Sequence, residues 1–186
     1  MSVMELTLWF VWILLPLAAV LALALLPRTS GIWRRRFAGA LAAFLGPVLL
    51  LLADKYLLPM RGVALRSWVF GCLWALMTVG AVSVLACAAF YLHARQSGWI
   101  ALLAQPLALL GCLFTLWWSF FYFAFSVRPD RVVEHDGQRF IEVDNSFLDE
   151  MYDYYDYRSL FLRGNEKRKS WGEGSWWGDP WEDIRP

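Results

Sequence analysis

The sequence predicts an all-α membrane protein, a four-transmembrane-helix bundle with a small extramembrane tail that contains a β-hairpin. Three observations lead to this fold class. The 186 residues are 59% hydrophobic, with 12 tryptophans and a net charge of only +1, a composition typical of membrane proteins. Four apolar segments are each long enough to cross a hydrocarbon core of roughly 30 Å. Residues 1–127 carry a net charge of +6 and residues 128–186 one of −5, so a basic membrane domain joins an acidic tail.

The predicted membrane helices cover residues 6–26, 37–58, 67–92 and 98–127. Three of these segments contain no charged residue, and the second is apolar until Asp54 and Lys55 near its end. Because backbone amides cannot stay unpaired in lipid, each segment is expected to be helical. Short loops between the segments make sequential helices antiparallel.

Small residues are expected to mediate the packing of these helices, because lipid removes the hydrophobic drive between them. They recur at helical spacing in every segment: Ala18 and Ala22; Gly39, Ala42, Ala43 and Gly46; Gly71, Ala75, Ser83 and Ala86; Ala104, Ala108, Gly111, Thr115 and Ser119. Together they favour a compact bundle over four independent anchors.

The first segment is expected to remain as a membrane helix and not to be cleaved as a signal peptide. Ala22-Leu23-Ala24 imitates a cleavage site, but residues 1–5 contain no Lys or Arg. Basic residues follow the segment instead, as Arg28 and the run Arg34–Arg36. Since Lys and Arg are retained on the cytoplasmic side, we expect the N-terminus and, after four crossings, the tail to lie outside the cytoplasm. The count over all flanking loops opposes this by six to five, so the orientation rests on the first helix.

Asp54 is the only acid within a predicted span, and with Lys55 it forms the candidate intramembrane polar site. A carboxylate within the membrane can mark a proton or ion path. The alternative is that both residues lie about one turn from the interface, paired or extended toward water. The chain contains no phosphate-binding loop, zinc-protease motif or nucleophile elbow. We therefore expect no enzyme, no metal and no cofactor.

The tail begins with the pattern of a hairpin. Two β-prone runs, residues 131–135 and 138–143, flank Asp136-Gly137. This dipeptide suits a type I′ turn, because both central residues of that turn need positive φ. Two strands alone are marginal in water, so the hairpin needs a further strand or a partner.

A third strand is expected from about Asp153 to Arg163, because this stretch is rich in β-prone aromatic residues. Gly164-Asn165 is then expected to turn the chain once more. Residues 147–152 fit either a helix or a strand. Together these elements would form a small antiparallel sheet in the tail.

The tail is also rich in the residue types that recur at protein interfaces and membrane interfaces. The candidate interaction surface consists of Tyr152, Tyr154, Tyr155, Tyr157, Phe161, Trp176 and Trp177. Acids interleave with these tyrosines and would be repelled by anionic headgroups. We therefore expect the surface to bind protein first and lipid second.

The tail resembles those of uncharacterised small bacterial polytopic membrane proteins. The resemblance is carried by the order of the hairpin, "VDNSFLD", "YDYRSLFLRGNEKR" and the Gly-rich "GSWWGDPWE". It implies a bacterial inner (cytoplasmic) membrane, and it supplies no activity or site residues.

The expected function is that of a small multi-pass membrane protein acting as an accessory, regulatory or immunity-type interaction protein through its tail. The alternative is a small transporter or channel component that uses Asp54, and a membrane-embedded enzyme comes third. Expected partners are the lipid bilayer and a protein bound by the tail, and self-association into a homo-oligomer stays open. Scattered basic residues and an acidic tail speak against nucleic acid.

Overall fold

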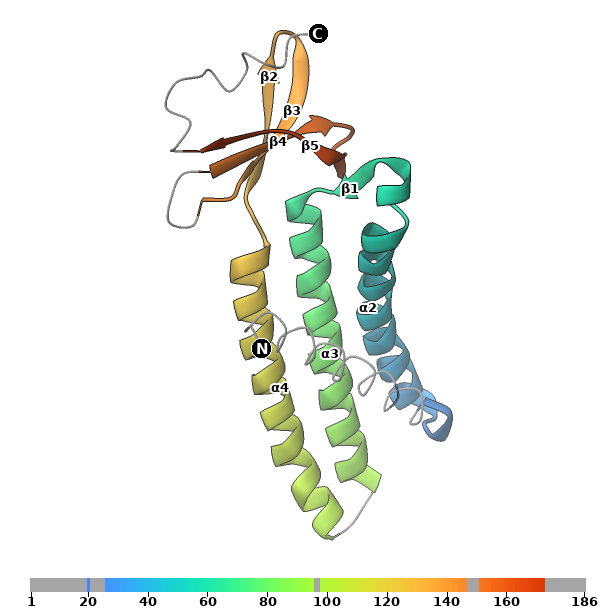
Figure 1. Cartoon of the computed structure of the whole chain (residues 1–186). Coiled ribbons are helices and arrows are strands. Elements are labelled where there is room, and N and C mark those ends of the chain that lie inside the picture. The colour runs from blue at the N-terminus through green and yellow to red at the C-terminus, as the bar shows by residue number, and fades with distance from the viewer. Residues whose placement is uncertain (1–19, 21–25, 96–97, 147–150, 173–186) are drawn as a thin grey trace. The chain divides into compact units, whose positions relative to one another are not determined.

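The computed structural model describes residues 20, 26–95, 98–146 and 151–172 (Figure 1). Three of the described helices are long and apolar enough to cross a membrane: α2 (Gly31–Tyr56), α3 (Ser67–Arg95) and α4 (Trp99–Ser126). The strands are β1 (Val63–Leu65), β2 (Asp130–His135), β3 (Gln138–Asp144), β4 (Met151–Tyr157) and β5 (Leu162–Gly172). The first predicted helix, 6–26, lies outside the described residues except for Val20 and Leu26.

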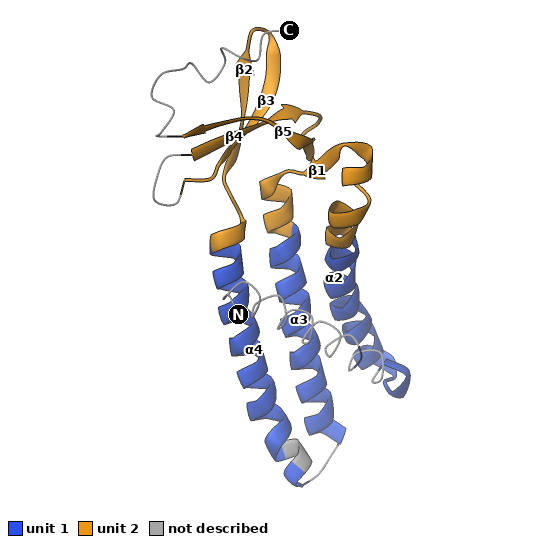
Figure 2. Cartoon of the chain, viewed as in Figure 1, with its two compact units in different colours: residues 1–49, 73–124 blue, residues 50–72, 125–186 orange. Residues whose placement is uncertain are grey.

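The chain divides into two compact units (Figure 2). Unit 1 comprises residues 1–49 and 73–124, and it holds most of the three helices. Unit 2 comprises residues 50–72 and 125–186, and it holds the sheet together with the end of α2 and the start of α3. Residues 50–72, which include the connection between α2 and α3, thus belong to the same unit as the predicted tail.

The helix α2 begins at Gly31, earlier than the predicted boundary at residue 37. The prediction began the helix at the first apolar residue after the arginine run. Arginine is itself a good helix former, so the helix can begin earlier. The run Arg34–Arg36 therefore lies in the first turns of α2 and not in a loop. The helix α3 likewise continues past residue 92 to Arg95.

The helices α2 and α3 touch backbone to backbone at Gly80. A Cβ atom placed on Gly80 would lie 2.5 Å from the backbone nitrogen of Phe44 and 2.7 Å from the carbonyl carbon of Ala43. Such close approach is how small residues let membrane helices pack. Of the predicted small residues, Ala43 lies at this contact, whereas Gly39 and Gly46 have open space beside them. Gly80 itself was missed.

Hydrogen bonds and ring stacking join α3 to α4. The indole Nε1 of Trp74 donates to Ser119 Oγ over 2.8 Å, and the Thr78 hydroxyl, which also bonds Ser119 Oγ, donates to the Trp74 carbonyl. The rings of Trp74 and Tyr122 stack with their centroids 4.0 Å apart. Ser119, predicted as a small packing residue, thus serves as a polar link, a contribution that is modest but directional between helices in lipid.

The five strands form one sheet in the order β1-β5-β4-β3-β2, with every neighbouring pair antiparallel. The predicted hairpin is confirmed as β2 and β3. Asp136 and Gly137 connect these strands with φ of 49° and 75°, the positive values that a type I′ turn requires. The predicted small sheet is present, but within the described residues it has five strands, and it draws β1 from the connection between α2 and α3.

The turn predicted at Gly164-Asn165 is wrong, because both residues lie inside β5. The chain reverses between Tyr157 and Leu162, and Gly164 pairs with Val63 of β1. A Cβ atom at Gly164 would lie 3.2 Å from Asp156 Cβ, so this glycine permits close strand packing and not a turn. Of the ambiguous stretch 147–152, residues 151 and 152 belong to β4, and 147–150 lie outside the described residues.

Replacing Gly80 by alanine should destabilise the α2–α3 pair, because the new methyl group would overlap the α2 backbone. Overpacking of this kind costs about 1–3 kcal/mol. The measurement is the apparent melting temperature of the full chain in detergent, followed by tryptophan fluorescence. Gly39→Ala is the matched control, since its methyl group enters open space and should cost nothing. Equal melting temperatures for the two variants would contradict the Gly80 contact.

Candidate functional site

A buried ion pair joins distant parts of the chain within unit 2. Arg66 Nε lies 2.9 Å from Asp130 Oδ2, and the two side chains are 7% and 2% exposed. Arg66 also donates from Nη1 to the Leu160 carbonyl (3.3 Å), and its backbone N–H donates to the Phe161 carbonyl (3.0 Å). A single residue immediately before α3 therefore binds the first residue of β2 and the turn between β4 and β5.

Asp54 caps the backbone of the edge strand β1. Its Oδ1 accepts a hydrogen bond from the Leu65 backbone N–H over 2.7 Å. Leu65 lies opposite Leu162 of β5, but its backbone N–H points to the outer side of β1, because in an antiparallel pair the bonds to β5 come from alternate residues such as Arg66. The Val63 N–H, also on the outer side, donates to the Leu58 carbonyl. The edge amides of β1 are thus satisfied, which protects the edge from pairing with another chain.

Lys55 does not join Asp54 in a shared site. Its Nζ lies 5.4 Å from the centroid of the Tyr56 ring, and its side chain is exposed. Within the described residues no ion pair connects Asp54 to Lys55. The predicted intramembrane polar site therefore consists of two residues with separate contacts, and Asp54 has a structural one.

Tyr154 belongs to the interior of the sheet, because β4 lies between β3 and β5. It is 5% exposed. The pKa of Tyr154 is raised to about 12, mainly because the hydroxyl is buried. The negative charge of Glu142, which accepts a hydrogen bond from this hydroxyl, raises the pKa further. Glu142 is in turn paired with Arg131, whose Nε lies 2.5 Å from Glu142 Oε1. This tyrosine is part of the polar network of the sheet and is not available to a partner.

The other tyrosines of β4 are half-buried and pack against neighbours in the sheet. Tyr155 lies beneath the guanidinium of Arg163, with 3.7 Å between Cζ and the ring centroid. The buried Nε and Nη1 of Arg163 have no hydrogen-bond partner among the described residues. The guanidinium contacts the face of the Tyr155 ring instead, as a cation–π pair. The remaining pairs are Tyr152 with Trp171 and Tyr157 with Arg139. The predicted residues Trp176 and Trp177 lie outside the described part of the chain.

An open polar pocket lies on the sheet, lined by Pro129, Asp130, Arg131, Glu142, Asp144 and Tyr152. Each of its carboxylates has a partner within the unit. Asp130 binds Arg66 and Glu142 binds Arg131, while the Ser146 backbone N–H donates to Asp144. Hydrogen bonding from Ser146 lowers the pKa of Asp144. Across the described ranges no three His, Cys, Asp or Glu side chains come together as metal ligands.

The turn between β4 and β5 exposes two apolar side chains. Leu160 is 57% and Phe161 is 53% exposed. The Phe161 ring contacts Trp68, with 5.6 Å between ring centroids. The Ser159 Oγ accepts hydrogen bonds from the N–H groups of Phe161 and Leu162, which fixes the turn. Phe161 was predicted as a surface residue, whereas Arg66 and Trp68, which hold it, carry no sequence signal.

Comparison of the chain with protein-family models, with curated proteins and with solved structures found no match.

Replacing Asp130 by asparagine should destabilise unit 2 strongly, because the charge of Arg66 would stay buried without its partner. Loss of one member of a buried pair costs about 3–5 kcal/mol. Hydrogen exchange of the strand amides in the full chain measures the effect. The matched control is Arg168→Gln, which breaks an exposed pair with Asp156 and should cost at most about 1 kcal/mol. Similar exchange rates in both variants would show that Arg66–Asp130 does not support the sheet.

The two candidate roles of Asp54 can be separated by two substitutions. Asp54→Asn keeps an oxygen for the Leu65 N–H and should leave the sheet intact. Asp54→Ala removes the acceptor and should destabilise the edge strand by about 1–3 kcal/mol, seen as faster exchange of the amides of residues 63–65. Lys55→Ala serves as the control without effect on exchange. Unchanged exchange in Asp54→Ala would contradict the structural role. A loss of proton or ion flux in Asp54→Asn vesicles, with unchanged exchange, would favour transport.

Proposed function

We propose that this chain is a multi-pass membrane protein with an accessory or regulatory role, and that unit 2 recognises a protein partner. The observation that carries the proposal is the turn between β4 and β5. Its backbone is fixed by hydrogen bonds to Arg66 and Ser159, yet it exposes more than half of Leu160 and of Phe161. A fixed turn with exposed apolar side chains is suited to binding.

Rigidity matters because ordering a flexible segment opposes association. The turn is ordered by contacts within unit 2, so a partner that covers Phe161 need not order the backbone. Large apolar anchors that enter a partner's pocket carry most of the energy at protein interfaces. Phe161, backed by Trp68, has the size and the support for such an anchor.

The charges around the turn favour protein over an anionic membrane surface as the partner. Asp156 bonds to both Arg158 and Arg168, and Lys167 lies 3.4 Å from Asp153. A segment that binds anionic headgroups is usually rich in uncompensated Lys and Arg. Here both signs alternate on neighbouring strands, a pattern that can complement a protein surface of mixed charge.

The setting that we propose is a bacterial inner membrane, with unit 2 outside the cytoplasm. The resemblance of the tail supports the first point. The basic run Arg34–Arg36 at the start of α2 supports the second, because such runs are retained on the cytoplasmic side. A reporter fused after Pro186 tests the orientation, since alkaline phosphatase is active only outside the cytoplasm.

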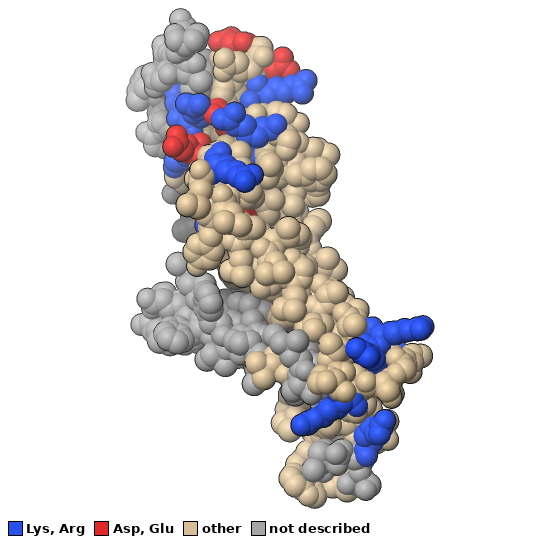
Figure 3. Space-filling model, turned by 90° about the vertical axis from the view of Figure 1, so that its right-hand side faces the viewer, with Lys and Arg blue, Asp and Glu red and all other residues tan. Residues whose placement is uncertain are grey.

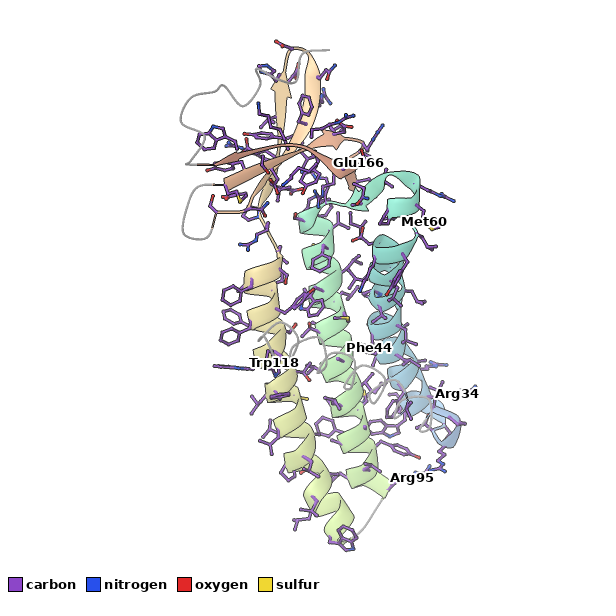
Figure 4. All side chains as sticks on the ribbon, in the orientation of Figure 1. Arg34, Phe44, Met60, Arg95, Trp118 and Glu166 are labelled. Carbon is purple, nitrogen blue, oxygen red and sulfur yellow. The ribbon has the colours of Figure 1, made fainter. Side chains whose placement is uncertain are left out.

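Replacing both Leu160 and Phe161 by alanine should weaken partner binding at least about tenfold, because the anchor is lost while the turn keeps its backbone bonds. A photo-crosslinking residue at position 161 identifies the partner, and titration with that partner in mild detergent measures the affinity. Met60→Ala is the matched control, since Met60 is 84% exposed in the same unit (labelled in Figure 4). Crosslinks to lipid alone, or equal affinity for both variants, would refute the proposal.

A further inference from the structure

Five arginines gather at one end of unit 1, and we call them the arginine cluster. Arg28 precedes α2, Arg34, Arg35 and Arg36 lie in its first turns, and Arg95 ends α3. All five side chains are exposed. Figure 4 shows Arg34 and Arg95 toward the same end of the helices, and the basic side chains there have no acidic side chain among them on the face seen in Figure 3.

The cluster is held in place by an aromatic core between α2 and α3. The Tyr91 hydroxyl of α3 donates to the Arg28 carbonyl over 2.9 Å, which fixes the segment before α2. The rings of Trp33 and Phe37 meet the Tyr91 ring edge to face, at 6.0 and 6.1 Å between centroids. Phe37 is fully buried in this contact. The backbone that carries the arginines is therefore well packed.

Two of the guanidinium groups lie over these rings. Arg36 Cζ is 5.4 Å from the centroid of Trp33, and Arg95 Cζ is 6.0 Å from that of Tyr91. A cation–π contact positions a guanidinium without neutralising its charge. Because the rings of Trp33 and Tyr91 are in contact, the guanidinium groups of Arg36 and Arg95 lie over neighbouring rings.

Within the described part of unit 1, no acidic side chain offsets the charge of the cluster. Residues 1–49 and 73–124 contain one acid, Glu5, which lies outside the described residues. In the described part of unit 1 none of the five arginines forms an ion pair. In unit 2, by contrast, Arg66, Arg131 and Arg168 each bind a carboxylate. Among the described residues of unit 1, the arginine cluster is thus left open to an anionic ligand.

We infer that the arginine cluster binds the phosphate groups of anionic phospholipids. Guanidinium matches phosphate oxygens in a bidentate geometry. The arginines border the apolar stretches of α2 and α3, where Trp and Tyr mark the boundary between hydrocarbon and headgroups. An anionic lipid is thus the source of phosphate that lies within reach and in high local concentration. This site belongs to unit 1 and is independent of the partner surface proposed for unit 2.

The test uses the purified full chain titrated with phosphatidylglycerol or phosphatidylcholine in mild detergent, with bound lipid counted by native mass spectrometry. Arg36→Gln with Arg95→Gln should lower the affinity for phosphatidylglycerol about twenty-fivefold, since each basic residue near anionic lipid contributes a factor of about five. Affinity for phosphatidylcholine should not change. Arg28, Arg34 and Arg35 remain in this variant to maintain membrane insertion.

Two further variants guard the interpretation. Lys55→Gln with Arg61→Gln removes the same charge from two exposed residues, one in the last turn of α2 and one after that helix, and should leave binding unchanged. Arg36→Lys with Arg95→Lys keeps the charge and should bind less tightly than the parent, because ammonium groups cannot form the bidentate contact. The inference is overturned if both glutamine variants lose binding equally, if the lysine variant matches the parent, or if inorganic phosphate at equal ionic strength displaces the lipid.

Discussion

The ion pair between Arg66 and Asp130 is the interaction on which the architecture of unit 2 depends. It connects the residue just before α3 to the start of β2, while the other contacts of Arg66 reach the carbonyls of Leu160 and Phe161. Buried ion pairs add little net stability compared with apolar packing, but leaving one partner alone is costly. The pair therefore disfavours any arrangement in which the helix connection and the tail do not meet. Arg66 also holds the backbone of the β4–β5 turn, whose Leu160 and Phe161 side chains are exposed.

Local patterns in the sequence were sufficient to predict the helices α2, α3 and α4 and the hairpin of β2 and β3. Apolar length placed α2, α3 and α4, and Asp136-Gly137 placed the turn between β2 and β3, because both signals depend only on neighbouring residues. The role of Val63–Leu65 as an edge strand could not be predicted, since its partner Leu162–Gly164 lies about a hundred residues away and no local pattern specifies such pairing. The same reason explains the error at Gly164. A glycine that permits contact with Asp156 looks, in sequence, like one that permits a turn.

In the candidate site, unusual residue types correctly indicated which residues make specific contacts, but the roles predicted for those residues were less accurate. Asp54 was singled out because a carboxylate in an apolar segment is unusual, and the structure gives it the Leu65 amide as a partner. The tyrosines of β4 were singled out for their interface chemistry, but an interior strand uses most of that chemistry within the sheet. Only Phe161 of the described candidates combines exposure of more than half with a fixed backbone. The division of the net charge into +6 for residues 1–127 and −5 for residues 128–186 indicated where acids are scarce, but it did not show which arginines form ion pairs.

The pairing of β1 with β5 has a consequence for the biogenesis of the protein. The two strands are made at different times, one before α3 and the other after α4, and both must reach the same aqueous compartment before they can pair. If α3 and α4 each cross the bilayer, the two crossings return the chain to the side it left, and the sheet can close. A chain in which one of these helices failed to insert would leave β1 and β5 on opposite sides. The sheet can therefore form only when both helices have inserted correctly. In a wrongly inserted chain the strands would stay unpaired and would be open to attack by a quality-control protease.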